Sequence, residues 1–173
     1  MASILQLAKI TSFATFLPAV SKPRENYQEI FEQNRQRVYA LCFWMTDNEL
    51  AAEELMQATF LRGLARSARP TPEELDRALV TELREQMPIG VLTLDEGVSC
   101  NSLSVRQNTL RVHLERALVQ LPPTERMVFL LHDVEGYDHE RITRLLGFTE
   151  DEARTGLHQA RLRMRNLVAK MER

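Results

Sequence analysis

The sequence contains few of the residues that build disulfide scaffolds, metal sites or β-sheets. Cysteine occurs only twice in 173 residues, as Cys42 and Cys100, with no spacing typical of paired metal ligands. Aromatic residues make up 6% of the chain, and runs in which β-branched and polar residues alternate are scarce. We therefore expect no disulfide framework, no metal site and no sheet, in a protein of the reducing cytoplasm.

The chain also lacks the groupings that enzymes need. It contains no Gly-rich phosphate-binding loop. His132 and Asp133 are adjacent and His139 follows, but adjacent side chains do not face each other on a helix, and no nucleophile accompanies them. We expect a protein that is not an enzyme and uses no cofactor or small-molecule substrate.

Net charge and the apolar N-terminus limit the partners further. A net charge of −2 argues against a protein that coats nucleic acid with its whole surface, so any DNA contact should be local. Residues 1–23 are mostly apolar, but the first basic residue, Lys9, lies inside the apolar run, whereas a secretory signal carries its basic residues ahead of it. Lys9 and several Ser, Thr and Gln also weaken a membrane-spanning interpretation. We expect a mobile or docking segment, with membrane attachment as the alternative.

The residues that are plentiful predict helices. Leu, Ala, Glu and Arg dominate, and 44% of the residues are hydrophobic. Apolar residues recur at helical spacing over residues 25–45, then up to Arg66, and again up to Gln86. Capping-box patterns at 46–49 and 71–74 mark the starts of the second and third helices. The fold class is therefore all-α. The side chains expected to be buried include Val38, Leu41, Met45, Ala52, Leu55, Phe60, Leu75, Leu79 and Leu83.

Composition divides the chain into two small helical domains. Residues 88–104 contain Gly, Ser and Asn and show no clear helical period, as is typical of a linker. We predict an apolar segment at 1–23, a first helical domain at 24–87, this linker, and a second helical domain at 105–173. The first apolar stripe of the second domain is expected to contain Leu110, Leu114, Ala117, Leu118 and Leu121.

The second domain contains the pattern of a helix-turn-helix. Asp138 is placed to cap a short helix, and Gly147 is placed to end it. Thr149 and Glu152 then form a capping-box pattern that opens another helix. Two helices joined by a short Gly-containing turn are typical of DNA-binding proteins, in which the second helix lies in the major groove.

This second helix has an apolar face and a basic face. Between Ala153 and Arg173 the chain has six Lys or Arg and one Glu, a local charge of +5. The expected buried face consists of Ala153, Leu157, Ala160, Met164 and Val168. The opposite face carries Arg154, His158, Arg161 and Arg165. Such a stripe predicts contact with phosphates and base edges, although a solvated helix face is the plainer interpretation.

The residues around this motif resemble region 4 of the extracytoplasmic-function (ECF) sigma factors. The resemblance is carried by Leu-Pro-Pro-Thr-Glu-Arg-Met-Val-Phe-Leu-Leu at 121–131, by Glu-Gly-Tyr at 135–137, by Glu-Arg-Ile at 140–142 and by Ala-Arg at 160–161. It departs where Asp-Glu-Ala-Arg-Thr at 151–155 replaces the Gly-Thr-Val-Lys-Ser-like start of the family's helix. The resemblance implies that the upstream (−35) promoter element is read by Arg141, Arg154, Thr155, His158, Arg161 and Arg165.

The first domain resembles region 2 of the same family. The match runs over residues 31–64, with Ala-Glu-Glu-Leu-Met-Gln-Ala-Thr-Phe at 52–60 close to the family's Ala-Glu-Asp-Leu-x-Gln-Glu-x-Phe. In the family this surface binds the large catalytic subunit of core RNA polymerase. The resemblance implies that Asp47, Glu53, Glu54 and Gln57 do so here. A solvated acidic helix face is the alternative.

The middle of the chain departs from the family's promoter-melting segment. That segment usually carries aromatic residues that hold unpaired bases, together with basic residues. This chain has no Phe, Trp or Tyr from Leu61 to Val128, and residues 70–110 contain three Arg against seven Asp or Glu. Such a surface should repel single-stranded DNA, so the resemblance implies a shortened or degenerate melting element.

These patterns together favour a sigma-type transcription initiation factor. Its expected partners are core RNA polymerase, promoter DNA and an anti-sigma factor. One alternative is a sigma-like decoy or co-regulator that binds an anti-sigma or partner sigma factor without melting DNA itself. A plain helix-turn-helix repressor is a further alternative, but it leaves the resemblance to region 2 unexplained.

Overall fold

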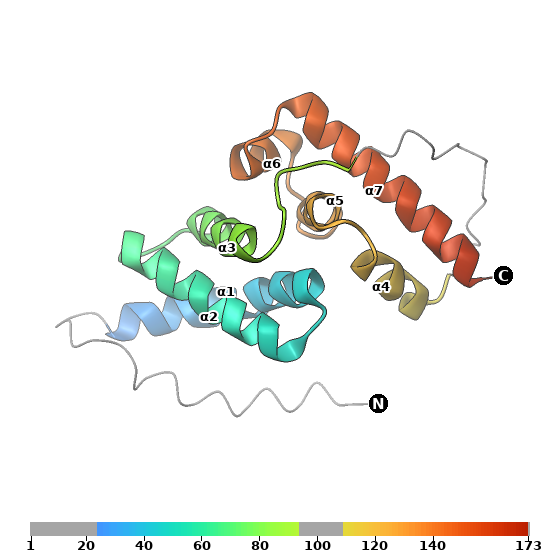
Figure 1. Cartoon of the computed structure of the whole chain (residues 1–173). Coiled ribbons are helices and arrows are strands. Elements are labelled where there is room, and N and C mark those ends of the chain that lie inside the picture. Colours follow the sequence, from blue (N-terminus) through green and yellow to red (C-terminus); the bar gives the residue numbers. More distant parts are fainter. Residues whose placement is uncertain (1–23, 94–108, 173) are drawn as a thin grey trace.

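The computed structural model describes residues 24–93 and 109–172, and all of the regular structure in these ranges is helical, as predicted (Figure 1). The predictions for residues 1–23 and for most of the linker lie outside the described residues. The elements in chain order are α1 (Arg24–Thr46), α2 (Glu49–Arg66), α3 (Pro72–Gln86), α4 (Arg111–Val119), α5 (Pro123–Phe129), the π-helical turn η3 (Leu130–Val134), α6 (His139–Leu146) and α7 (Glu150–Met171).

The first three helices form an N-terminal bundle. Its core contains the predicted apolar stripes, with Leu41, Leu55 and Phe60 almost completely buried. The predicted capping box that opens α3 is confirmed: the Thr71 hydroxyl accepts a hydrogen bond from the Glu74 amide, and the Glu74 carboxylate accepts one from the Thr71 amide. These reciprocal bonds satisfy amides that the first turn of a helix leaves without partners. Among the described helices, none combines the length and the apolar character that a membrane span requires.

The predicted capping box at 46–49 is wrong. The N-cap of α2 is Asn48, whose side chain accepts a hydrogen bond from the amide of Ala51 (3.0 Å). Thr46 is instead the last residue of α1, and its hydroxyl donates to the carbonyl of Cys42 one turn earlier (2.9 Å). Because α1 continues through Thr46, the hydroxyl is used within that helix and is not available to cap the next one.

The remaining helices form a C-terminal unit around α5 and α7. All five side chains predicted for the inner face of α7 are buried, and Gly156 lies among them. Two of the predicted core residues near α4 are not in the core: Leu110 is 61% exposed and Leu114 is 43% exposed. The buried residues of α4 are Ala117 and Leu118. Only the C-terminal part of this short helix therefore contributes to the core.

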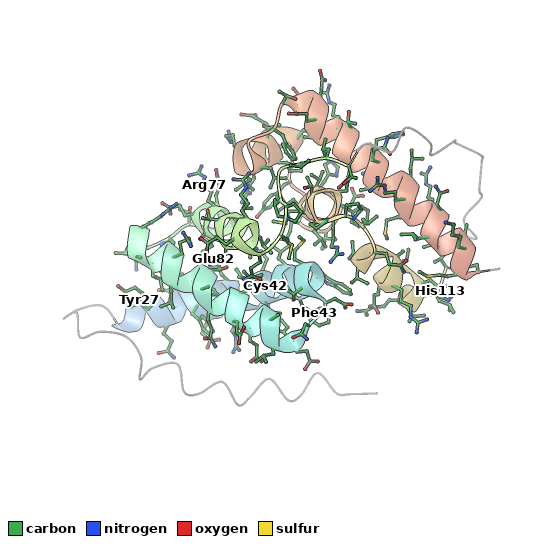
Figure 2. All side chains as sticks on the ribbon, in the orientation of Figure 1. Tyr27, Cys42, Phe43, Arg77, Glu82 and His113 are labelled. Carbon is green, nitrogen blue, oxygen red and sulfur yellow. The ribbon has the colours of Figure 1, made fainter. Side chains whose placement is uncertain are left out.

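The two units pack directly against each other. Figure 1 shows α5 at the centre of the view, between the N-terminal bundle and α7, and Figure 2 shows side chains filling the space between α3, α5 and α6. Nη2 of Arg84 on α3 donates to the carbonyl of Leu146 at the end of α6 (2.7 Å). Nη1 of Arg126 on α5 donates to the carbonyl of Met45 in α1 (3.0 Å).

Residues 88–93, the described beginning of the predicted linker, lie against the C-terminal unit. The Thr124 hydroxyl accepts from the amide of Gly90 (3.1 Å) and donates to the carbonyl of Pro88 (3.0 Å). Leu92 lies over Gly156 of α7, where a Cβ atom would meet Leu92 Cδ2 at 2.8 Å. The absence of a side chain at Gly156 therefore allows this segment to approach the helix closely.

A buried carboxylate joins the units on the side of α3 and α6. Asp76 of α3 is 1% exposed. Its oxygens accept hydrogen bonds from Nη1 of Arg37 (2.6 Å), from the Tyr137 hydroxyl (2.6 Å) and from Nη2 of Arg141 (3.3 Å). The Glu135 carboxylate lies 3.7 Å from Arg37, and burial raises its pKa. We call these five residues the Asp76 junction.

Candidate nucleic-acid interface

The predicted helix-turn-helix is formed by α6 and α7. The Asp138 carboxylate accepts from the amide of Arg141 (2.8 Å) and caps α6. Gly147 ends that helix with φ of 69°, a left-handed conformation that glycine adopts at little cost. Thr149 and Glu152 then form the predicted capping box at the start of α7. These caps hold the two helices at a sharp turn and leave the outer side of α7 free.

Five of the six predicted DNA-binding side chains share the outer face of α7. Arg154, Thr155, His158, Arg161 and Arg165 are exposed, on the side opposite the buried stripe. Figure 2 shows side chains projecting from this side of α7, away from α5. The sixth residue, Arg141, is not part of this face. It lies over the ring of Tyr137, 3.6 Å from the ring centroid, and donates to Asp76 of the N-terminal bundle.

Two arginines of the outer face already have carboxylate partners. Arg154 pairs with Glu150 one turn earlier (2.5 Å), and both side chains are more than half exposed. Arg161 instead reaches across to η3, where its Nε and Nη2 donate to the two oxygens of Asp133 (2.9 and 2.5 Å). Sequence reasoning identified both arginines but found neither partner.

The acidic residues that open α7 have local roles. Glu152 belongs to the capping box, and its hydrogen bonds with the backbone amide and the hydroxyl of Thr149 lower its pKa. Glu150 pairs with Arg154. Only Asp151, which is exposed, has neither of these roles. Negative charge at this end of a helix is also favoured by the helix dipole.

The predicted polymerase-binding residues form an exposed acidic side of α2 and the turn before it. Asp47 and Glu54 are exposed, and Glu53 and Gln57 are partly exposed. Asp47 adopts φ of 53°, which places it in the tight turn between α1 and α2. Leu50 and Leu61, respectively 66% and 49% exposed, lie on the same side as Glu54 at helical spacing. Sequence reasoning missed these two leucines, although both stand outside the predicted buried stripe. We call this surface the α2 face.

The described residues contain no group of three or more His, Cys, Asp or Glu side chains placed to hold a metal ion. Cys42 is completely buried in the N-terminal bundle, and burial raises the pKa of its thiol to about 12. A thiol so far from ionisation is a poor nucleophile.

Comparisons with known proteins connect both units to one family. The family model described as "Sigma-70, region 4" matches residues 104–164. The chain is 27% identical over 161 residues to the RNA polymerase sigma factor CarQ of Myxococcus xanthus, covering 86% of this chain and 92% of that protein. It is 28% identical over 160 residues to the ECF RNA polymerase sigma factor SigE of Mycolicibacterium smegmatis, covering 84% of this chain and 62% of that one.

A solved structure shows the same fold. The sigma factor RpoE of Bartonella quintana, crystallised with the anti-sigma factor NepR, superposes with a TM-score of 0.62 at 16% identity, over 85% of this chain and 98% of that chain. The family model accounts for the C-terminal unit, and the full-length relatives extend the match across the N-terminal bundle. Over about 85% of its length the chain is therefore similar to RNA polymerase sigma factors, one of them an ECF sigma factor, and its C-terminal unit matches the family model for region 4.

Proposed function

We propose that this chain is a sigma factor that binds core RNA polymerase through the α2 face and reads the upstream (−35) promoter element with the outer face of α7. The observation that carries the proposal is the capped helix-turn-helix, whose second helix buries its apolar side and exposes a basic one. The major groove of B-DNA is about 12 Å wide and admits one α-helix. Similarity to RNA polymerase sigma factors supplies the polymerase as the partner.

The position of each side chain along α7 suggests its role. Arg154, Thr155 and His158 lie in the first three turns, and side chains near the start of a recognition helix reach base edges. Arg165 lies about two turns after His158, where phosphate contacts are more common. Base contacts provide sequence preference, and phosphate contacts provide affinity and its salt dependence.

The α2 face suits a protein partner better than nucleic acid. Its carboxylates would repel phosphate, whereas Leu50 and Leu61 provide apolar surface beside them. Protein interfaces commonly combine an apolar centre with a charged rim. These two exposed leucines are therefore proposed as polymerase contacts together with Glu53, Glu54 and their neighbours.

The surface of α3 supports the proposal of a degenerate melting element. Arg77 on this helix is paired with Glu73, and Arg62 of α2 is paired with Glu82 and Glu85. The charges of these two arginines are thus neutralised, and the segment has no aromatic residue on which an unpaired base could stack. We propose that melting here depends on the polymerase or on other residues more than in a typical family member.

The aromatic residues of α1 are poor replacements for that platform. Tyr39 and Phe43 stack with their ring centroids 6.3 Å apart, and both are partly buried against the core. Burial raises the pKa of Tyr39, and the negative charges of Glu49 and Glu53 raise it further. The negative potential around Tyr39 would repel the phosphate backbone of single-stranded DNA.

Because the expected melting platform is missing, a decoy or co-regulator is the second candidate function. Such a protein would bind an anti-sigma factor, or a partner sigma factor, without melting promoter DNA itself. The solved relative RpoE is bound to the anti-sigma factor NepR, and we propose that this chain also has an anti-sigma partner. In both cases the chain works in the cytoplasm, where polymerase and DNA are found.

Run-off transcription with purified core polymerase and a library of genomic promoters separates the two candidates. An initiation factor yields discrete transcripts that depend on the added chain. A decoy binds a partner sigma factor or an anti-sigma factor and yields no transcript from any promoter, even when core polymerase is in excess.

Reversing two charges on the α2 face is expected to weaken core-polymerase binding. In a Glu53→Lys, Glu54→Lys variant, the carboxylates proposed to contact the polymerase become positive. Because Glu54 is exposed and Glu53 is partly exposed, we expect the free energy of unfolding to change by no more than about 0.5 kcal/mol. Affinity for core polymerase is measured by fluorescence titration. The matched control is Glu29→Lys with Glu32→Lys on α1, both exposed, and equal binding by the two double variants would contradict the assignment.

Substitutions along α7 are expected to separate base reading from phosphate binding. Arg154→Ala should change which upstream sequence is preferred, by about 1–3 kcal/mol if the guanidinium pairs with a guanine. Arg165→Ala should instead weaken binding to all sequences alike and reduce the salt slope by about one. Fluorescence anisotropy on a promoter duplex and a scrambled duplex, over a salt series, distinguishes these effects. If neither variant changes binding to either duplex, α7 does not read DNA.

A further inference from the structure

The bond between Arg161 and Asp133 joins the recognition helix to a different element. Arg161 is in the middle of α7, and Asp133 is in the π-helical turn η3, 28 residues earlier. Nε and Nη2 of Arg161 each donate to a different oxygen of Asp133, at 2.9 and 2.5 Å. A guanidinium and a carboxylate that make two parallel hydrogen bonds are fixed in orientation as well as in distance.

Asp133 is itself held in place from a second side. Contrary to the expectation that these adjacent side chains do not face each other, Nδ1 of His132 lies 2.8 Å from Oδ1 of Asp133. The His132 ring also packs against the ring of His139, with centroids 5.0 Å apart. The hydrogen bond from Arg161 lowers the pKa of Asp133, as does the bond with His132. The carboxylate therefore stays ionised at neutral pH. π-helical turns such as η3 occur frequently at functional sites.

The bond leaves the other edge of the guanidinium open. An arginine has five N–H donors, and Asp133 occupies one on Nε and one on Nη2. Both donors of Nη1 and the second donor of Nη2 remain, and the Arg161 side chain is 47% exposed. These donors form a fork that matches the O6 and N7 acceptors of guanine.

Charge decides between a base and a phosphate as the partner of this fork. Arg161 and Asp133 together carry no net charge, so the pair attracts phosphate far less than a lone arginine does. Hydrogen bonds from Arg161 to a neutral base edge are weakened less, because they depend on the geometry of its donors and not on the net charge of the pair. Arg161 lies seven residues after Arg154, about 10 Å along the helix axis, and so remains within reach of the same groove.

From this geometry we infer that Asp133 is a specificity-determining positioning residue, which holds Arg161 for reading a guanine and prevents it from acting as a general phosphate contact. The inference rests on the proposed function, because it requires α7 to lie in the major groove. Asp133 lies outside the recognition helix. Neither the basic face of α7 nor the helix-turn-helix spacing points to this residue.

The test uses holoenzyme assembled from core polymerase and the full chain, with a pool of duplexes randomised over one helical turn of the upstream element. Enriched sequences give the base preference at each position. Affinities for the enriched duplex and a scrambled duplex, measured over a salt series, give the discrimination and the salt slope. Wild type is compared with Asp133→Asn, Arg161→Ala, Arg161→Lys and Arg154→Ala.

We expect Asp133→Asn to abolish a guanine preference at one position and to reduce discrimination about tenfold. Affinity for the scrambled duplex should rise and the salt slope should steepen by about one, because Arg161 regains an unpaired charge. Arg161→Ala and Arg161→Lys should abolish the same preference, since neither side chain has the fork. The matched control is Glu150→Gln, which removes the carboxylate from a more exposed pair on α7 and should leave the preference at this position unchanged.

Three other outcomes contradict the inference in distinguishable ways. If Arg161→Ala abolishes a preference that Asp133→Asn retains, Arg161 reads a base without help from Asp133. If neither variant has an effect while Arg154→Ala shifts the preference, α7 reads DNA without this pair and only the inference fails. If none of the arginine variants changes the preference, the proposed reading of DNA by α7 fails as well. Unchanged circular dichroism and unchanged affinity for core polymerase exclude misfolding as the cause.

Discussion

Replacing Asp76 by Ala is expected to lower the free energy of unfolding by about 3 kcal/mol. The carboxylate is 1% exposed and accepts hydrogen bonds from Arg37, Tyr137 and Arg141. Its removal takes a buried acceptor from two cations and a hydroxyl, and breaking a buried pair in this way typically costs about 3–5 kcal/mol. We expect the lower end of this range, because the side chains of Arg37 and Arg141 are 23% and 29% exposed and can partly rehydrate.

Two probes of urea unfolding measure this effect and its location. Trp44 is the only tryptophan of the chain and reports on α1, whereas circular dichroism reports on all helices. In the wild type the two transitions should coincide, because the Asp76 junction ties the units together. In Asp76→Ala they should separate as the units unfold independently. Coincident and unshifted transitions would show that apolar packing alone couples the units.

Two further variants distinguish the junction from a general effect of charge. Asp76→Asn retains an acceptor of nearly the same shape, so its loss of stability should be smaller. Glu73→Ala removes a carboxylate from the same helix, but its pair with Arg77 is partly exposed, and we expect a change within about 0.5 kcal/mol. Asp76→Ala also releases Arg141 from its hydrogen bond with Asp76. The affinity of this variant for scrambled DNA should therefore rise, although its free energy of unfolding falls.

Features that depend on neighbouring residues could be predicted from the sequence. The caps at Thr71, Asp138 and Thr149 are bonds between groups three residues apart, and the chemistry of the two side chains is sufficient to predict them. The inner face of α7 followed from helical periodicity for the same reason. The cap at Thr46 failed because the pattern does not tell whether the previous helix has already ended.

Features that depend on distant partners could not be predicted. Asp76 and Tyr137 are 61 residues apart, and nothing near Asp76 indicates that it will be buried. Arg141 and Arg161 were interpreted as DNA contacts because they are basic and on or near the motif. Their partners, Asp76 and Asp133, come from elements whose placement only the fold determines. Leu110 and Leu114 followed the apolar period, yet they lie on the part of α4 that does not contact the core.

The conspicuous motif at 121–126 illustrates the same limit. Resemblance identified it with the family's region 4, but did not indicate what its polar residues do. In the structure Thr124 binds the backbone of residues 88–90, and Glu125, which is fully buried, accepts from the amide of Thr93 (2.9 Å). The motif therefore attaches the C-terminal unit to the segment that leaves α3. Arg126, the next residue, attaches the same unit to α1.

Replacing Arg126 by Met is expected to destabilise the chain by about 3 kcal/mol. The guanidinium of Arg126 donates to the carbonyls of Trp44 and Met45 at the end of α1. It also donates to the carbonyls of Val119, the last residue of α4, and of Leu121. Burial lowers its pKa, but an arginine remains charged at any ordinary pH. Methionine fills similar space and leaves these carbonyls without a donor, and each hydrogen bond to a charged group contributes about 1.5–3 kcal/mol.

The loss should stay below the sum of the four hydrogen bonds, because carbonyls near the surface can bind water once the guanidinium is gone. Arg126→Lys should be intermediate, since a single ammonium cannot reach carbonyls on both sides. Arg116→Met, at an exposed position of α4, is the matched control, with an expected change within about 0.5 kcal/mol. Urea unfolding followed by Trp44 fluorescence is the direct measurement, because the Trp44 carbonyl is one of the acceptors. If Arg126→Met unfolds at the same urea concentration as Arg116→Met, the contact between α5 and α1 is held by apolar packing alone.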